Sequence, residues 1–172
     1  MEKVNVIETV WIAVEENVNL AARIWMPSKT RRAAVPAILE YIPYRRRDFT
    51  RSRDEAIHKN FAEAGYASLR VDIRGSGDSD GLMHDEYSPQ ELQDGLKVIE
   101  WIANQPWCDG SVGMMGKSWG AYNSLQIAAL QPPALKAILP VMGTDDRWKE
   151  DIHFRNGLMA TDNFWWGSIM QL

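Results

Sequence analysis

The chain has 172 residues, of which 45% are apolar and 24% are charged. This length and composition allow one globular domain with a hydrophobic core. Lysine and arginine together number 19, against 23 for aspartate and glutamate, which leaves a net charge of −4. A chain without excess positive charge has no general attraction for nucleic acids or anionic membranes, so we expect neither as a partner.

The cysteine content and the N-terminal residues bear on location. The single cysteine, Cys108, excludes an intramolecular disulfide and fits a reducing compartment. Polar and charged residues interrupt the start of the chain, and no run of about 18 apolar residues occurs in it. We therefore expect neither a signal peptide nor a membrane span, and we expect a cytoplasmic protein.

The expected elements begin with an antiparallel hairpin and continue as an alternation of strands and helices. The hairpin comprises strands at 4–14 and 18–26. Apolar runs and helical spacing then predict strands at 35–42, 66–73, 112–116 and 137–142, and helices at 51–64, 88–104 and 119–130. This alternation predicts an α/β fold with a mostly parallel sheet covered by helices. No strand is expected after residue 142.

Local signals support two of these helices. Gly65 follows the first helix, at the position where a glycine often ends a helix. Ser88, Pro89 and Glu91 resemble a capping box at the start of the second.

The segment from Gly116 to Gly120 has the pattern G-x-S-x-G, with Ser118 at its centre. It lies between a predicted strand and a predicted helix, which is where a nucleophile elbow occurs. Such a turn strains the serine backbone, and side chains at the two glycine positions would collide with neighbouring elements. The alternative is that Ser118 only caps the following helix.

Two further polar segments have structural interpretations. The glycine-rich loop RGSGDSDG at 74–81 lacks the third glycine of a dinucleotide-binding loop and carries acidic residues, so we expect a tight structural turn. A nucleotide-binding domain would rest on this loop alone. The cluster Arg45, Arg46 and Arg47 is followed by acidic residues and is interpreted as a solvated surface.

Most of the chain resembles one family of large serine hydrolases, which includes X-Pro dipeptidyl-peptidases (S15), cocaine esterase and α-amino acid ester hydrolases (CocE/NonD). The matching stretches occur in the family's order and are LAARIWMP, PAILEYIPYRRRD, FAEAGYASLRVDIRGSGDSDG and DGLKVIEWIANQPWCDGSVGMMGKSWGAYNSLQIAALQPPALKAILP. The resemblance implies an α/β-hydrolase fold. It also implies cleavage of an ester or amide bond in a small molecule or a peptide, through an acyl-enzyme.

The resemblance further implies roles for three positions. Ser118 corresponds to the nucleophile, the backbone N–H of Trp119 to one oxyanion-hole donor, and the hydroxyl of Tyr44 to the other. From its residue type alone, Tyr44 would instead be interpreted as a boundary tyrosine that packs its ring under the loop.

No triad acid or histidine is predicted in this chain. In the hydrolase order these residues follow the serine, and His58, His84 and His153 are each interpreted as ordinary, partly exposed histidines. They show no metal-ligand spacing, so neither a metal nor another cofactor is expected.

Because family members are longer, we expect a truncated chain. Residues 1–142 correspond to the N-terminal part of the hydrolase domain and 143–172 to the start of a helical cap. The exposed sheet edge would then favour self-association or pairing with the missing C-terminal part. The leading hypothesis is a serine hydrolase, and the alternative is a catalytically incomplete fragment that acts as a folding or interaction module. Peptide, amide and ester substrates all remain open.

Overall fold

The computed structural model describes residues 4–28 and 34–170. They form two compact units, divided between Val141 and Met142, and each unit is described by itself. In chain order the elements are β1 (Val4–Glu15), β2 (Val18–Pro27), β3 (Val35–Ile42), α1 (Arg51–Glu63), β4 (Ala67–Asp72), α2 (Pro89–Ala103), β5 (Cys108–Lys117), α3 (Trp119–Ala129), β6 (Leu135–Val141), β7 (Phe154–Arg155), β8 (Leu158–Met159) and α4 (Asp162–Met170). Within this described part of the chain, no helix has the length and apolar character needed to cross a membrane.

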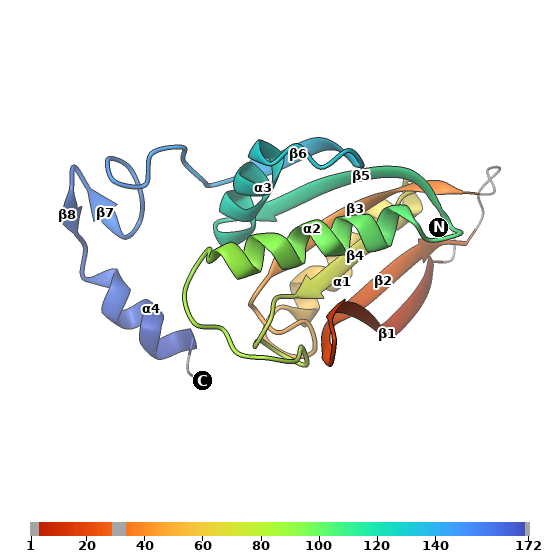
Figure 1. The fold of residues 1–172 in the computed structure, drawn as a ribbon, viewed down its shortest axis with the longest axis horizontal. Coiled ribbons are helices and arrows are strands. Elements are labelled where there is room, and N and C mark those ends of the chain that lie inside the picture. The colour runs from red at the N-terminus through yellow and green to blue at the C-terminus, as the bar shows by residue number, and fades with distance from the viewer. Residues whose placement is uncertain (1–3, 29–33, 171–172) are drawn as a thin grey trace. The chain divides into compact units, whose positions relative to one another are not determined.

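The first unit is built on one sheet with the strand order β1-β2-β4-β3-β5-β6 (Figure 1). The hairpin β1–β2 joins the rest through an antiparallel pairing of β2 with β4. Strands β4, β3, β5 and β6 are parallel, and Leu39 of β3 pairs with Leu69 of β4 on one side and with Met114 of β5 on the other. The predicted mostly parallel sheet with an antiparallel N-terminal hairpin is confirmed.

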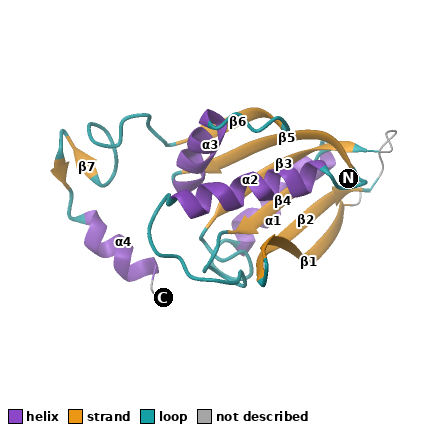
Figure 2. Ribbon diagram, in the orientation of Figure 1, coloured by secondary structure: helices purple, strands orange, loops and turns teal. Residues whose placement is uncertain are grey.

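Helices cover both faces of this sheet, with α2 and α3 together on one face and α1 on the other (Figure 2). The direction of winding explains the arrangement. The chain passes from β3 through α1 to its neighbour β4, and then through α2 to β5 on the far side of β3. Right-handed crossovers in opposite directions place their helices on opposite faces. In such sheets a binding crevice lies outside the carboxyl ends of the strands where the direction reverses, which here are β3 and β5.

The core of the first unit lies around the central strands. All six residues of β4 are buried, and the buried side chains of β3 include Leu39, Tyr41 and Ile42. At one sheet edge, by contrast, β6 leaves Leu139 56% exposed and Val141 38% exposed. A partner for this edge remains a prediction.

Strand β5 begins at Cys108, four residues before the predicted start. An Asp-Gly pair such as Asp109–Gly110 favours a turn, and Gly110 does have a φ of +85°. The β3–β5 register shifts at this point, because Val35 pairs with Cys108 whereas Ala37 pairs with Val112. The strand therefore absorbs the turn residues as an irregularity in its ladder.

The second unit contains the β7–β8 hairpin and α4. The expectation of no strand after residue 142 was wrong. Asn156 and Gly157 have φ values of +48° and +80°, the conformation that an Asn-Gly pair supplies in a two-residue hairpin turn. The hairpin is only two pairs long, too short for a pattern of alternating side chains to reveal it. Its assignment as the start of a cap remains a prediction.

Candidate active site

Ser118 lies at the turn between β5 and α3, with φ of +55° and ψ of −112°. A non-glycine residue rarely adopts such a backbone, and residues of this kind cluster at functional sites. The backbone is held on both sides, because Ser118 N donates to Val141 O at 2.9 Å and Ser118 O accepts from Ala121 N at 2.8 Å. The turn is therefore strained and also firmly fixed.

The two glycines of the motif permit close packing around this turn. A Cβ added to Gly116 would lie 2.5 Å from backbone atoms of Gly120, and one added to Gly120 would lie 2.9 Å from Cγ2 of Ile42 on β3. Real Cβ contacts under 3.0 Å essentially never occur. The expected collisions at both glycine positions are confirmed.

The Ser118 side chain does not cap α3, since it makes no capping hydrogen bond. Its hydroxyl instead shares a hydrogen bond with the side chain of Tyr44. Tyr44 follows β3 and Ser118 follows β5, and these strands are neighbours in the sheet. The winding reversal between β3 and β5 thus brings together two residues that are 74 positions apart in the sequence.

Tyr44 is half-buried, and its ring meets the Trp119 ring edge-on with centroids 6.4 Å apart. Burial raises the pKa of the Tyr44 hydroxyl above its ordinary value, and the hydrogen bond with Ser118 offsets only part of this increase. The phenol therefore keeps its proton at neutral pH. A neutral hydroxyl beside the serine can donate a hydrogen bond to an oxygen on which negative charge develops.

The Trp119 backbone is suited to a similar donation. Trp119 is the first residue of α3, and the first N–H groups of a helix have no acceptor within it. The positive end of the helix dipole adds to this preference for negative charge. The structure thus places Ser118, Tyr44 and Trp119 together at the carboxyl ends of β3 and β5.

A buried carboxylate beneath the turn, that of Glu91, was not identified from the sequence as part of the site. Glu91 is 5% exposed, and Oε1 accepts hydrogen bonds from Trp119 Nε1 at 2.7 Å and Asn123 Nδ2 at 2.8 Å. Burial raises the pKa of the Glu91 carboxyl, while these donors and the Tyr87 amide oppose the increase. The capping motif was the only sequence signal, and the Ser88 hydroxyl does accept from Glu91 N at 3.2 Å.

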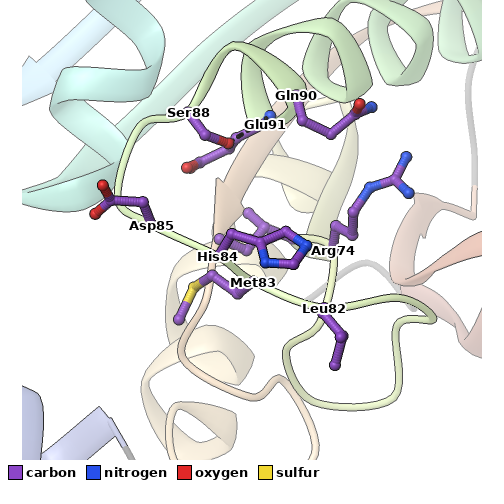
Figure 3. Close-up of a pocket in the computed structure, with 9 residues that line it drawn as sticks. Arg74, Leu82, Met83, His84, Asp85, Ser88, Gln90 and Glu91 are labelled. Carbon is purple, nitrogen blue, oxygen red and sulfur yellow. Dashed lines mark hydrogen bonds between the residues drawn. The ribbon is translucent and has the colours of Figure 1, made fainter.

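Glu91 also lines a small pocket between the start of α2 and the loop before it (Figure 3). Arg74, His84 and Asp85 are on its border, whereas Ser118 and Tyr44 are not among its lining residues. This pocket is therefore separate from the candidate nucleophile.

The loop at 74–81 is structural, as expected. Ser79 Oγ accepts from Ala21 N at 2.9 Å and donates to Asp72 O at 2.7 Å, which ties the loop to β2 and β4. Asp80 is similarly bonded to Asn19, whose backbone amide donates to its carboxylate at 2.9 Å. The loop's polar groups thus serve its own connections to the sheet.

The interpretation of the arginine cluster was wrong for Arg46, which is only 1% exposed. Its Nη2 lies 3.0 Å from Asp78 Oδ2, and its Nε lies 3.7 Å from Asp72 Oδ2. Arg47 is exposed as expected. Aspartates from the distant loop and from the end of β4 neutralise Arg46, and this permits its burial.

The expectation of partly exposed histidines was wrong for His58 and His153. His58 is fully buried and stacked on Trp25 with ring centroids 4.7 Å apart. His153, in the second unit, is 8% exposed, and its Nδ1 lies 2.9 Å from Asp162 Oδ2. His84 is exposed. Both buried histidines contact residues from other parts of the chain, and the sequence around each histidine does not reveal these contacts.

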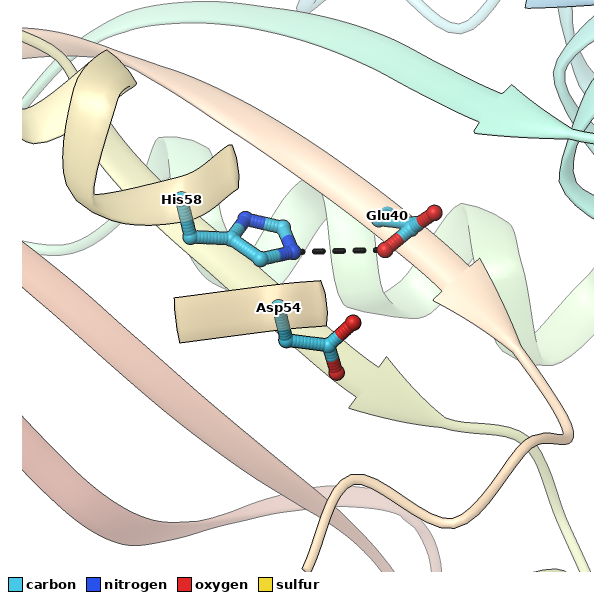
Figure 4. Close-up of side chains that lie close together, drawn as sticks. All are labelled: Glu40, Asp54 and His58. Carbon is cyan, nitrogen blue, oxygen red and sulfur yellow. Dashed lines mark hydrogen bonds and ion pairs between the residues drawn. The ribbon is translucent and has the colours of Figure 1, made fainter. Parts of the chain in front are cut away.

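His58 belongs to a buried group with Glu40 and Asp54, whose candidate ligand atoms lie within 4.8 Å of one another (Figure 4). Two guanidinium groups already contact these carboxylates. Arg53 Nη2 is bonded to both Glu40 and Asp54, and Arg70 Nε lies 3.3 Å from Asp54 Oδ2. A metal ion would be repelled by these two fixed positive charges, so the geometry fits an internal ion network better than a metal site.

Comparison with known proteins finds relatives that are named as hydrolases. Cocaine esterase of Rhodococcus sp. is 30% identical over 161 residues, which are 92% of this chain and 27% of the esterase. A CocE/NonD family hydrolase of Staphylococcus aureus superposes with a TM-score of 0.83 at 25% identity, covering 98% of this chain and 33% of the other. An α-amino acid ester hydrolase superposes with a TM-score of 0.71 at 27% identity, covering 92% and 29%.

The chain thus spans about a quarter to a third of the length of these relatives. They confirm the α/β-hydrolase fold expected from the sequence. The family model for X-Pro dipeptidyl-peptidase (S15 family) matches residues 16–172. A match over most of the chain, together with these hydrolase relatives, shows that the chain belongs to the X-Pro dipeptidyl-peptidase (S15) family.

Proposed function

We propose that this chain carries the nucleophile of a serine hydrolase, which cleaves an ester or amide bond through an acyl-enzyme on Ser118. The observation that carries the proposal is the strained Ser118 backbone at the β5–α3 turn, with the Tyr44 hydroxyl hydrogen-bonded to the serine side chain. The names of the relatives include both an esterase and an ester hydrolase, which supports the same reaction class.

In this mechanism Ser118 Oγ attacks the carbonyl carbon of the substrate and forms a tetrahedral intermediate. The negative oxygen of that intermediate accepts hydrogen bonds from the Tyr44 hydroxyl and the Trp119 N–H. Each such donor typically lowers the barrier by about 3 kcal/mol. Collapse of the intermediate expels the alcohol or amine, which takes up the proton lost by the Ser118 hydroxyl, and leaves an acyl-serine. Water then hydrolyses the acyl-serine, releases the acid and restores the serine hydroxyl.

The serine hydroxyl must lose its proton to a general base during attack. His58 is unsuited to this role, because its Nδ1 lies 2.7 Å from Ser68 Oγ and its Nε2 lies 3.2 Å from Glu40 Oε2. Both ring nitrogens are therefore engaged in the interior. Replacing each histidine in turn tests whether this chain supplies the base.

Treatment of the purified chain with a fluorophosphonate probe, followed by intact-mass measurement, tests the proposal. We expect one adduct on the wild-type chain and none on Ser118→Ala. Lys117→Ala is a matched control, because the exposed neighbour has no role in the mechanism and its replacement should preserve labelling. A folded wild-type chain that fails to react would contradict the proposal for this chain and would favour an interaction module.

A further inference from the structure

A buried ion network lies below the loop that carries Tyr44. Its centre is Arg70 of β4, which is fully buried. Arg70 Nε lies 3.3 Å from Asp54 Oδ2 on α1, and Arg70 Nη1 lies 3.2 Å from Asp72 Oδ1 at the end of β4. Glu40 of β3 lies 3.8 Å from the same guanidinium. Burying so many charges is costly and seldom adds net stability, so a role other than stability is expected for the network.

Three hydrogen bonds connect this network to the backbone around Tyr44. Arg70 Nη1 donates to Ile42 O at 3.1 Å, two residues before the tyrosine. Asp72 Oδ1 accepts from Arg46 N at 3.0 Å, two residues after it. The third connection reaches Tyr44 itself, whose carbonyl oxygen lies 3.2 Å from Thr50 Oγ1. The main chain on both sides of Tyr44 is therefore fixed by buried polar groups.

Thr50 joins this third connection to the network. Its hydroxyl also lies 2.8 Å from Asp54 Oδ2, so it is within hydrogen-bond distance of both the carboxylate and the Tyr44 carbonyl. Thr50 occupies the position before α1 where a threonine side chain usually caps the helix, yet it makes no capping hydrogen bond. The Thr50 hydroxyl is directed toward the Asp54 carboxylate and the Tyr44 carbonyl, and not toward the backbone amides at the start of the helix.

We propose that Thr50 is a positioning residue, which holds the Tyr44 backbone through Asp54 and Arg70 so that the tyrosine hydroxyl faces Ser118. The catalytic consequence rests on the proposed function, in which Tyr44 stabilises the oxyanion. The position of Tyr44 does not depend on that function and can be measured separately.

The structural test uses fluorine NMR of the chain labelled with 3-fluorotyrosine. The chain contains five tyrosines, so five resonances are expected. Tyr44→Phe assigns the resonance of Tyr44. We expect Thr50→Val to move or broaden this resonance while the other four stay in place, and Thr50→Ser, which keeps the hydroxyl, to leave it near its wild-type position. Ser52→Ala, an exposed substitution on α1, is the matched control and should change nothing.

An unchanged Tyr44 resonance in folded Thr50→Val overturns the proposal, and so does an equal movement of all five resonances. If Thr50→Val does not fold, Thr50→Ser still decides: a displaced Tyr44 resonance in that folded variant contradicts a role for the hydroxyl.

The catalytic test compares rates of fluorophosphonate labelling. We expect Thr50→Val to slow labelling by 10- to 100-fold, on the order reported for small misplacements of a reacting group, and Thr50→Ser to restore it. The double variant Thr50→Val/Tyr44→Phe should react no more slowly than Tyr44→Phe alone. The proposal is overturned if Thr50→Val slows labelling by the same factor in the Tyr44→Phe background as it does in the wild-type chain. A wild-type chain that does not label contradicts only the proposed function, because the fluorine resonance reports the position of Tyr44 without any reaction.

Discussion

The packing at Gly116 leads to a quantitative prediction for Gly116→Ala. The added Cβ would lie 2.5 Å from the Gly120 backbone, whereas ordinary contacts begin at 3.4 Å. The start of α3 must therefore move away from β5 by roughly 0.9 Å to accommodate it. Overpacking of this kind costs about 1–3 kcal/mol. A displacement near 1 Å in a catalytic turn can lower reactivity by about 10²-fold.

Gly113→Ala is the matched control, since Gly113 lies on the same strand and neither glycine has a positive φ. A Cβ on Gly113 would meet its nearest neighbour at 3.7 Å, an ordinary contact. Alanine there should be neutral or slightly stabilising, by up to about 1 kcal/mol.

Thermal unfolding followed by circular dichroism measures the difference in stability. For a chain of this size, about 1 kcal/mol corresponds to a change in Tm of about 2–4 °C. We expect Gly116→Ala to unfold several degrees below wild type and to react about 100-fold more slowly with the fluorophosphonate probe. Gly113→Ala should unfold at the wild-type temperature or slightly above it and react at the wild-type rate. Equal Tm values and equal labelling rates for the two alanine variants would refute the reasoning.

Three further predictions concern the polar groups of the site. Tyr44→Phe removes one oxyanion donor and should lower kcat for an ester by about 10²- to 10³-fold with little change in KM; steady-state kinetics check this, and a changed KM with constant kcat would contradict it. Burial raises the pKa of Glu91, so the folded chain retains this proton more readily than the unfolded chain, and the contribution of Glu91 to stability is lost as pH rises through its folded pKa. In urea unfolding, wild type should therefore lose stability relative to Glu91→Gln as the pH rises above about 4, the ordinary glutamate pKa; a difference that is constant or moves the other way would refute it. Arg70→Met leaves the carboxylates of Asp54 and Asp72 buried with fewer cationic partners, and it should lower the free energy of unfolding by about 3–5 kcal/mol, which urea denaturation measures against wild type.

Much of the fold could be predicted because its signals are local. Apolar runs marked the strands, helical spacing marked the helices, and Gly65 has the positive φ expected of a residue that follows a helix. The G-x-S-x-G pattern predicted both the position of Ser118 and the close packing at its glycines. The start of β5 was harder to predict, because the turn signal at Asp109–Gly110 lies within the strand. The β7–β8 hairpin was missed because it is only two residue pairs long.

The sequence by itself thus determined the order of the elements as far as β6, the strand-to-helix turn at Ser118 and, through family resemblance, the relevance of Tyr44. Only the tertiary structure decided which polar side chains are buried. Polar residues such as Arg46, His58 and Glu91 usually lie at the surface, yet these three are buried. Residues distant in the chain supply their partners: Asp78 for Arg46, Ser68 for His58 and Trp119 for Glu91. The energy of burying a polar group depends on where its partner lies in space. That position is fixed by the winding of the sheet and cannot be read from neighbouring residues in the sequence.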